Sequence, residues 1–570
     1  MAGFDTVIRG ALLVDGTGAA PVRADLAIKA GTIAAIGTDL PAGGHEIDAS
    51  GLVLTPGFVD VHTHYDGQVT WENQLIPSSC HGVTTAVIGN CGVGFAPCRP
   101  NAEARDGLVR LMEGVEDIPH PVLTEGLPWC WESFGDYLDF LGQRQYDMDV
   151  VAYMPHAPLR VYVMGERGAN REPASEADRA EMARLLGEAL DQGAAGIATS
   201  RTLFHRSSDG RPIPTYDAAQ DEMLALARVL RARGKGVFQI VEDLHLPNSG
   251  IGTLAEIAET AGRPLTFSFG TGNTGPHHYP AMLDELAAAN RRGLVMKAQV
   301  MPRAIGLVLG FDLTLNPFYT SETFRRVAAL PLAERLAQLR RPEVRAAVLA
   351  DAPDPDPALV LGRMVRNFEH MFVLGDPPAY EQPPEASIAA RADAQGISPE
   401  ELAYDILAAG ADGGRLYLAM ANFAEGNLDA VGDILDHPDV VLGLGDGGAH
   451  VATICDASYS TFALTHWVRD RSHGRKRLED MVHRMSGATA ALMGLDDRGV
   501  LAVGRRADLN LIDLDALSLS PPELTRDLPG GGQRLVQRAS GYRLTMIGGV
   551  AVQQNGVPTG ELPGRLVRMN

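Results

Sequence analysis

The sequence predicts an α/β protein built on a parallel sheet, with a small β-sandwich made from both ends of the chain. Two observations carry this prediction. The middle of the chain alternates buried apolar runs with helical patterns, and both ends contain short strands separated by glycine turns. Such alternation is typical of βαβ units, and eight units would close into a TIM-like (β/α)8 barrel with its site at the carboxyl ends of the strands.

The two ends of the chain have the same pattern. At the N-terminal end, residues 6–14, 24–29 and 32–37 are expected to be short strands. Residues 507–513 and 544–552 have similar character at the C-terminal end. Because neither stretch has enough apolar residues for a core of its own, we expect them to pair in one discontinuous β domain.

The middle of the chain supplies the strands of the parallel sheet. The expected buried strands are 83–88, 150–153, 196–200, 236–241, 265–269, 294–300 and 440–445. Helices are expected between several of them, for example over 176–192 and 220–233. Two stretches rich in proline and acidic residues, 97–131 and 351–398, fit the alternation poorly and are predicted to be insertions or long loops.

These patterns divide the 570-residue chain into three parts. Residues 1–56 are expected to form the N-terminal part of the β-sandwich, and residues 500–570 its C-terminal part. Residues 57–499 are expected to form the barrel with its two insertions. The length suits a barrel-sized domain with accessories better than one small module.

Composition narrows the class of partner and the compartment. The net charge of −22 argues against nucleic acid, which requires basic patches. No stretch approaches the roughly 18 apolar residues of a membrane span, and no basic-then-apolar signal peptide opens the chain. The five cysteines are odd in number and scattered, which is typical of a reducing cytosol. We therefore expect a cytoplasmic protein without a membrane partner.

The strongest chemical signal is the short apolar strand that ends in His62-x-His64. Residues i and i+2 of a strand point to the same face, so the two imidazoles project together and can share one cation. Asp446 follows another apolar strand, between Gly445 and Gly447. Its alternative role is that of a helix N-cap or turn residue.

These motifs together resemble the amidohydrolase superfamily, and within it the D-aminoacylase (N-acyl-D-amino-acid deacylase) family. The resemblance rests on residues 56–66, 82–85, 89–92, 159–165, 445–447 and 499–509, which spread over nearly the whole chain. It implies a (β/α)8 barrel with a small β-sandwich, and hydrolysis of an amide bond. The resemblance is also compatible with a homo-oligomer.

The resemblance implies that His62, His64 and Asp446 bind a divalent metal, usually zinc. Cys91, in Gly89-Asn90-Cys91-Gly92, matches a further metal ligand of the D-aminoacylase branch, and a thiolate suits zinc. A metal lowers the pKa of water from about 15.7 toward 7 and polarises a carbonyl. Asp446 is expected to be the catalytic residue that accepts the water proton and passes it to the leaving nitrogen.

The sequence departs from the branch at two further metal-ligand positions. Gln239 and Ser268 stand where histidines are expected, so the sequence favours one metal, with a second left open. His245, Glu242 or the pair His277-His278 are alternative ligands. Gln239 and His278 are equally candidates for contacts with the substrate.

The remaining candidates for substrate contacts are two arginines and two histidines. Arg201 and Arg303 are candidates because arginine makes bidentate pairs with carboxylates. His156 follows a strand, and His450 comes four residues after Asp446. Each of the four has the alternative of a structural role in an ion pair or hydrogen bond.

The sequence therefore predicts a metal-dependent hydrolase that cleaves the amide bond of a small molecule, an N-acyl amino acid or similar amide. The first alternative is a hydrolase of cyclic amides, similar to hydantoinases. The second is a non-catalytic scaffold, which the two missing histidines motivate. A serine hydrolase is disfavoured because the chain lacks a Gly-x-Ser-x-Gly motif.

Overall fold

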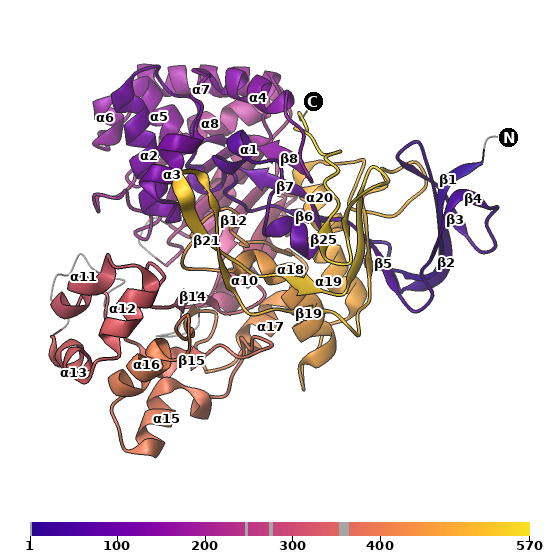
Figure 1. The fold of residues 1–570 in the computed structure, drawn as a ribbon. Helices are drawn as coiled ribbons and strands as arrows, with labels where there is room; N and C mark the ends of the chain where they lie inside the picture. The colour runs from indigo at the N-terminus through magenta and orange to yellow at the C-terminus, as the bar shows by residue number, and fades with distance from the viewer. Residues whose placement is uncertain (1–2, 246–248, 273–277, 353–363, 570) are drawn as a thin grey trace.

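Parallel strands form the centre of the protein in the computed structural model, which describes residues 3–245, 249–272, 278–352 and 364–569 (Figure 1). One set pairs in the order β6-β7-β8, and a second in the order β9-β10-β11-β12-β13-β17. The strands are β6 (Phe58–Asp60), β7 (Val83–Ile88), β8 (Asp149–Ala152), β9 (Met154–Pro155), β10 (Gly196–Arg201), β11 (Val237–Glu242), β12 (Leu265–Phe269), β13 (Met296–Val300) and β17 (Val440–Leu442).

The two sets form one ring. Strands β8 and β9 are separated only by Tyr153, so they continue each other as one strand position. Beyond the ends of β6 and β17, Thr63 bridges Gly447 in parallel, and the His64 amide donates to the Gly447 carbonyl at 2.8 Å. The predicted α/β class with a parallel strand order is confirmed, and the carboxyl ends of all these strands meet at one edge.

Helices between the strands cover the ring. The predicted helices at 176–192 and 220–233 correspond to α7 (Glu176–Asp191) and α8 (Gln220–Arg233). The other helices that follow ring strands are α1 (Gln68–Trp71), α4 (Phe134–Gly142), α5 (His156–Met164), α6 (Glu166–Ala169), α9 (Ile251–Ala261), α10 (Tyr279–Arg291), α17 (Asp429–Asp436), α18 (Tyr459–Phe462), the π-helix η6 (Ala463–Asp470), α19 (Leu478–Met485) and α20 (Gly487–Met493). No helix in the described part of the chain is both long and apolar enough to cross a bilayer.

Both ends of the chain share one nine-stranded sheet among the described residues, with its own core. Its strands are β1 (Phe4–Leu13), β2 (Val22–Lys29), β3 (Thr32–Gly37), β4 (Gly43–Asp48), β5 (Val53–Pro56), β18 (Leu509–Ile512), β23 (Tyr542–Ile547), β24 (Val550–Gln554) and β25 (Val557–Pro558). The two halves join where β5 pairs antiparallel with β18. The stretch 544–552 is a hairpin, because Gly548 and Gly549 turn the chain with φ values of 55° and 75°.

The first predicted insertion is helical, with α2 (Ala102–Glu116) and α3 (His120–Gly126). A C-terminal hairpin, β20 (Glu523–Leu528) and β21 (Gly532–Val536), lies beside α3 (Figure 1). The Leu535 amide of this hairpin donates to the Val451 carbonyl at 2.6 Å. A second short pair, β19 (Ser518–Leu519) and β22 (Ala539–Ser540), accompanies it.

The second insertion lies within a larger unit between β13 and β17 that has its own core. Its antiparallel sheet has the order β14-β16-β15. The unit contains β14 (Ile305–Leu309), β15 (Met371–Val373), β16 (Leu416–Ala421), α11 (Glu322–Ala328), α12 (Leu332–Leu339), α13 (Pro342–Ala350), α15 (Ile388–Gln395) and α16 (Pro399–Ala408). It therefore extends beyond the stretch 351–398 on both sides.

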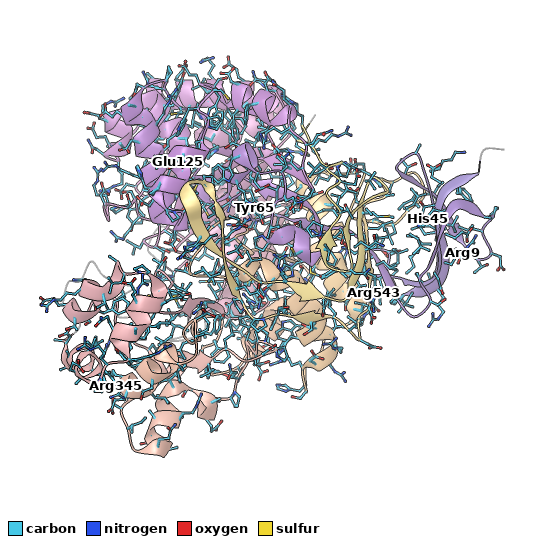
Figure 2. The ribbon with its side chains drawn as sticks, in the orientation of Figure 1. Arg9, His45, Tyr65, Glu125, Arg345 and Arg543 are labelled. Carbon is cyan, nitrogen blue, oxygen red and sulfur yellow. The ribbon has the colours of Figure 1, made fainter. Side chains whose placement is uncertain are left out.

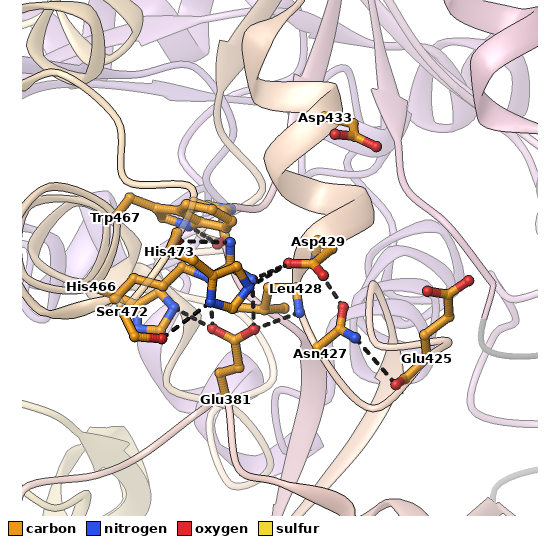
Figure 3. Close-up of polar contacts among 12 residues, drawn as sticks. Glu381, Glu425, Asn427, Leu428, Asp429, Asp433, His466, Trp467, Ser472 and His473 are labelled. Carbon is orange, nitrogen blue, oxygen red and sulfur yellow. Dashed lines mark hydrogen bonds and ion pairs between the residues drawn. The ribbon is translucent and has the colours of Figure 1, made fainter.

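A half-buried carboxylate, Glu381, joins this unit to the segment that follows β17 (Figure 3). Glu381 accepts hydrogen bonds from the Leu428 amide at 2.8 Å and from His466 Nε2 at 2.7 Å. Arg471 donates to both Glu381 oxygens, at 2.8 and 2.9 Å, and also to Asp429. These hydrogen bonds hold the Arg471 guanidinium in a fixed orientation against the Glu381 carboxylate.

A second ionic cluster joins the ring to the C-terminal segments. The Asp149 carboxylate is fully buried on β8 and accepts from Arg498 Nη1 at 2.5 Å, from Arg506, and from the Arg565 amide at 2.8 Å. Arg498 is itself only 3% exposed. Arg498 also pairs with Asp497 and Arg506 with Asp508, but removal of Asp149 would take away the buried carboxylate that the two arginines share.

We predict that Asp149→Ala lowers the free energy of unfolding by about 3–5 kcal/mol, because two largely buried arginines lose the carboxylate that they share. Chemical denaturation followed by circular dichroism measures it. The matched control is Asp405→Ala, which removes an exposed pair with Arg345 and should cost no more than about 1 kcal/mol. Equal losses in the two variants would contradict the prediction.

Candidate metal centre

Four predicted side chains meet at the carboxyl edge of the ring. His62 and His64 follow β6, Cys91 follows β7, and Asp446 follows β17. All four line one cavity of about 120 Å³. The intervening Thr63 points away and donates its hydroxyl to the Val87 carbonyl at 2.8 Å. The alternation of side chains along the strand therefore aims both imidazoles into the cavity.

The donor atoms have the spacing of ligands around one cation. His62 Nε2 lies 3.3 Å from Cys91 Sγ and 3.4 Å from Asp446 Oδ1. His64 Nε2 lies 3.6 Å from Cys91 Sγ and 3.7 Å from Asp446 Oδ1. Ligands of a tetrahedral zinc ion, at bond lengths of about 2.0–2.3 Å, are about 3.3–3.7 Å apart. His62, His64 and Cys91 therefore form a group of donors that could share one cation, and Asp446 lies within reach of both imidazoles.

The ring of His62 is held in the orientation that a metal ligand needs. Its Nδ1 lies 2.6 Å from Gln299 Oε1, an amide oxygen that can only accept a hydrogen bond. Nδ1 therefore carries the proton, and Nε2 presents its lone pair to the cavity. Gln299 comes from β13 and was not predicted as a site residue, although a glutamine in the apolar run 294–300 is a signal that could have revealed it.

Unusual backbone conformations aim Cys91 and Asp446. Their φ values are 57° and 45°, in the left-handed region that costs a non-glycine residue free energy. Gln239 supports the first turn, since its Oε1 accepts the Cys91 amide at 3.1 Å. The residue that stands in place of an expected histidine thus braces the Cys91 loop from β11.

The turn that carries Asp446 packs directly on the His-x-His segment. Tyr65, which follows that segment, is buried in the interior of the protein, unlike the peripheral Arg345 and Arg543 (Figure 2). A Cβ atom on Gly447 would lie 2.4 Å from Ser78 Oγ, and one on Gly448 would lie 2.7 Å from the Tyr65 ring. Glycine is required at both positions because of this close approach.

Burial sets the electrostatics of the cavity. Loss of solvent lowers the pKa of His62 to about 4 and that of His64 well below its ordinary value. The same effect raises the pKa of Asp446 to about 6 and that of the Cys91 thiol well above its ordinary value. The imidazoles are therefore neutral at pH 7, which is the form that binds a metal. A cation in the cavity would favour the ionised carboxylate and thiolate.

The structure brings His450 to the cavity, but not the other predicted substrate-contact residues. The His156 ring lies between Thr199 Oγ1 at 2.8 Å and Glu222 Oε1 at 3.0 Å. Arg201 pairs with Glu242 at 2.9 Å, so the Glu242 carboxylate already has a partner. These contacts match the structural alternative for both residues.

Arg303 is fully buried and engaged in a network beside the cavity. It donates to Asp456 Oδ1 at 2.7 Å and to Ser458 Oγ at 3.1 Å, and it lies over the Tyr380 ring at 3.8 Å. Asp456, in turn, lines the cavity. Arg303 therefore contacts the site indirectly, by holding the Asp456 carboxylate that lines the cavity.

The alternative metal ligands are placed differently. His278 and His245 are exposed, and His277 lies outside the described residues. Ser268 lines the cavity from β12, as expected for its position in the sequence. Its hydroxyl has no hydrogen-bond partner among the described residues.

Two further residues of the cavity were not predicted. His205 lines it from the loop after β10, with Nδ1 2.8 Å from Ser200 Oγ. Glu116 lines it from the last residue of the inserted helix α2 and is 1% exposed. Burial, together with Asp446 and Asp66, raises the pKa of Glu116 well above its ordinary value. Nothing in the sequence marks Glu116, because its helix lies in a stretch that fits no barrel element.

Comparisons with known proteins show which proteins this chain is similar to. The model of the amidohydrolase family matches residues 45–553. A D-aminoacylase of Alcaligenes xylosoxydans xylosoxydans is 27% identical, covering 99% of this chain and 97% of that protein. A structure of N-acyl-D-glutamate deacylase from Bordetella bronchiseptica, complexed with zinc and a phosphonate inhibitor, covers 99% of this chain and 100% of that one, with a TM-score of 0.64 and 23% identity. A D-aminoacylase structure described as having a binuclear metal centre has a TM-score of 0.65 and 22% identity, with 99% of each chain covered.

We predict that a thiol reagent near neutral pH modifies one cysteine per native chain and five after unfolding. Cys130 is exposed, whereas Cys91 and the other three cysteines are buried, and burial both blocks access and raises the thiol pKa. Absorbance of the released chromophore measures the count. Rapid modification of a native Cys130→Ser variant at Cys91, located by mass spectrometry of the digested protein, would show that Cys91 is accessible and contradict the geometry.

Proposed function

The chain belongs to the amidohydrolase family, and on this basis we propose that it is a metal-dependent hydrolase of the amide bond in an N-acyl amino acid or a similar small amide. The proposed ligands are His62, His64, Cys91 and Asp446. The observation that carries the proposal is the spacing of their donor atoms, 3.3–3.7 Å for the four separations given above. A decayed scaffold would have no reason to retain four donors at this spacing.

Zinc is the proposed cation because two imidazoles, a thiolate and a carboxylate form a donor set that suits it. The relative crystallised with zinc supports this choice. We propose one cation per chain, since Gln239 and Ser268 stand on β11 and β12 where further histidines were expected. The Gln239 oxygen is occupied by the Cys91 amide.

A divalent cation held here would polarise the amide carbonyl and lower the pKa of water toward neutrality. Asp446 would take a proton from the attacking water and deliver it to the leaving nitrogen. His62 and Gln299 would keep the neutral imidazole in one tautomer throughout the reaction. The buried walls of the cavity would exclude bulk water and strengthen these interactions.

The substrate class follows from the relatives, whose names denote deacylases of D-amino acids. We propose an open-chain N-acyl amino acid as the substrate. The scattered cysteines, four of them buried and free, support a cytoplasmic location.

We predict that Asp446→Asn lowers kcat by about 100- to 10,000-fold, because the amide cannot accept the proton. Hydrolysis of N-acetyl amino acids, measured by amine release, tests it. Asp436→Asn is the control, since that carboxylate is 68% exposed and pairs with Lys476 on the surface. Wild-type kcat in Asp446→Asn would refute the assigned role.

Removal of the cation with a chelator should abolish hydrolysis, and zinc should restore it. The reason is that neither Asp446 nor the neutral imidazoles can polarise a carbonyl by themselves. Amine release and metal content are measured on the same samples. Full turnover in a preparation without metal would contradict the proposal.

A substrate panel separates the proposed reaction from hydrolysis of rings. We expect turnover of N-acyl amino acids and none of hydantoins or lactams of similar size. Exclusive turnover of the cyclic amides would instead support the hydantoinase-like alternative.

A further inference from the structure

The inserted helix α2 ends inside the metal cavity with a carboxylate that the proposed function does not use. Glu116 Oε1 lies 3.3 Å from His64 Nδ1, and Glu116 Oε2 lies 3.6 Å from His450 Nε2. Neither His64 Nδ1 nor Glu116 Oε1 makes a hydrogen bond within the described part of the chain, and their separation is slightly longer than that of a well-formed one. Two buried polar atoms thus face each other and lack any other contact.

We infer that Glu116 is a positioning residue whose carboxylate accepts a hydrogen bond from His64 Nδ1 and thereby directs Nε2 of that ring to the metal. This inference rests on the proposed function, because it concerns the affinity of the same cation site.

The contact repeats the arrangement at the neighbouring ligand. His62 donates a hydrogen bond from Nδ1 to Gln299 Oε1, and its Nε2 lies toward Cys91 and Asp446. His64 turns Nε2 toward the same two groups and Nδ1 toward Glu116. A carboxylate behind a metal-binding imidazole fixes the tautomer and makes the ring a stronger donor. One imidazole therefore has an amide as its acceptor, and the other has a carboxylate.

The backbone fixes the position of this carboxylate. The Glu116 carbonyl accepts the His450 amide. Thr453 Oγ1 donates to Asp117 Oδ2 at 3.1 Å. Both contacts tie the end of α2 to the loop that carries Asp446. The insertion thus holds together the loops after β6 and β17.

The charges in the cavity explain why a carboxylate is suitable at this position. A divalent cation is balanced by the Cys91 thiolate and the Asp446 carboxylate. Glu116 adds negative charge behind His64, where it favours a bound cation and compensates a proton shared with Nδ1. Without a cation, the same burial favours the neutral, protonated form of Glu116.

The test compares zinc affinity in Glu116→Gln, Glu116→Ala and the wild type, by competition with a chromophoric chelator and without substrate. We expect affinity to fall about 10- to 100-fold, with the stoichiometry unchanged. Glu116→Gln should show the smaller loss, because its amide oxygen still accepts from Nδ1 but carries no charge. Glu103→Gln, on the exposed first turn of the same helix, should match the wild type.

Two further measurements separate positioning from general stability. The visible absorption of the Co²⁺-loaded Glu116→Gln protein should differ from that of the wild type, because His64 becomes a weaker donor. The unfolding temperature of the metal-free Gln variant should equal that of the metal-free wild type. Unchanged zinc affinity in Glu116→Ala would overturn the inference, as would the loss of a whole equivalent of bound zinc, which would make Glu116 a ligand.

These outcomes differ from a failure of the proposed function. If the wild-type chain takes up no zinc, the metal-dependent hydrolase is wrong. If the wild type binds zinc and the Glu116 variants bind it equally well, only the positioning role is wrong.

Discussion

The site depends on two buried imidazoles, a buried thiol, the buried Glu116 carboxyl group and the half-buried Asp446 carboxyl group around one small cavity. Each of these groups loses solvation there, and an unpaired buried charge is costly. The shifts of pKa have the direction that burial imposes: the imidazoles are neutral, and the acids resist ionisation. A divalent cation would reverse the effect on the acids. The ionised forms of the acidic groups are therefore more stable in this cavity with a divalent cation than without one.

The ring of parallel strands supports His62 and Cys91 through side chains from three strands. Gln299 on β13 orients His62, Gln239 on β11 braces the Cys91 turn, and Asp60 on β6 accepts the His62 amide at 3.1 Å. Because parallel strands end at one edge, supports that are far apart in the sequence reach the same cavity. The inserted helix supplies Glu116 in a similar way from outside the ring.

The parts of the fold that the sequence predicted well are those with a local signal. Strands 83–88 and 265–269 are buried apolar runs and are found with the predicted bounds. The strand expected at 440–445 ends at Leu442, because glycines and the positive φ of Leu444 turn the chain toward Asp446. The His-x-His pair follows from the alternation along a strand.

The rest of the site has no such signal. Glu116 lies in a stretch whose composition resembles a loop, and only packing of α2 against the loop after β17 brings it to the cavity. Arg201 and Arg303 were candidates for substrate contacts, with a structural ion pair as the alternative, and the sequence does not show which acidic residues lie beside them. Glu242 and Asp456 occupy them here.

The central claim is that one cation is held by nitrogen, oxygen and the Cys91 sulfur together. X-ray absorption spectroscopy of the zinc-loaded protein tests it most directly, because sulfur and lighter ligands scatter at different distances. The account predicts one sulfur per zinc at about 2.3 Å and three nitrogen or oxygen ligands at about 2.0–2.2 Å. A shell of nitrogen and oxygen alone would remove Cys91 from the centre and contradict the proposed ligand set.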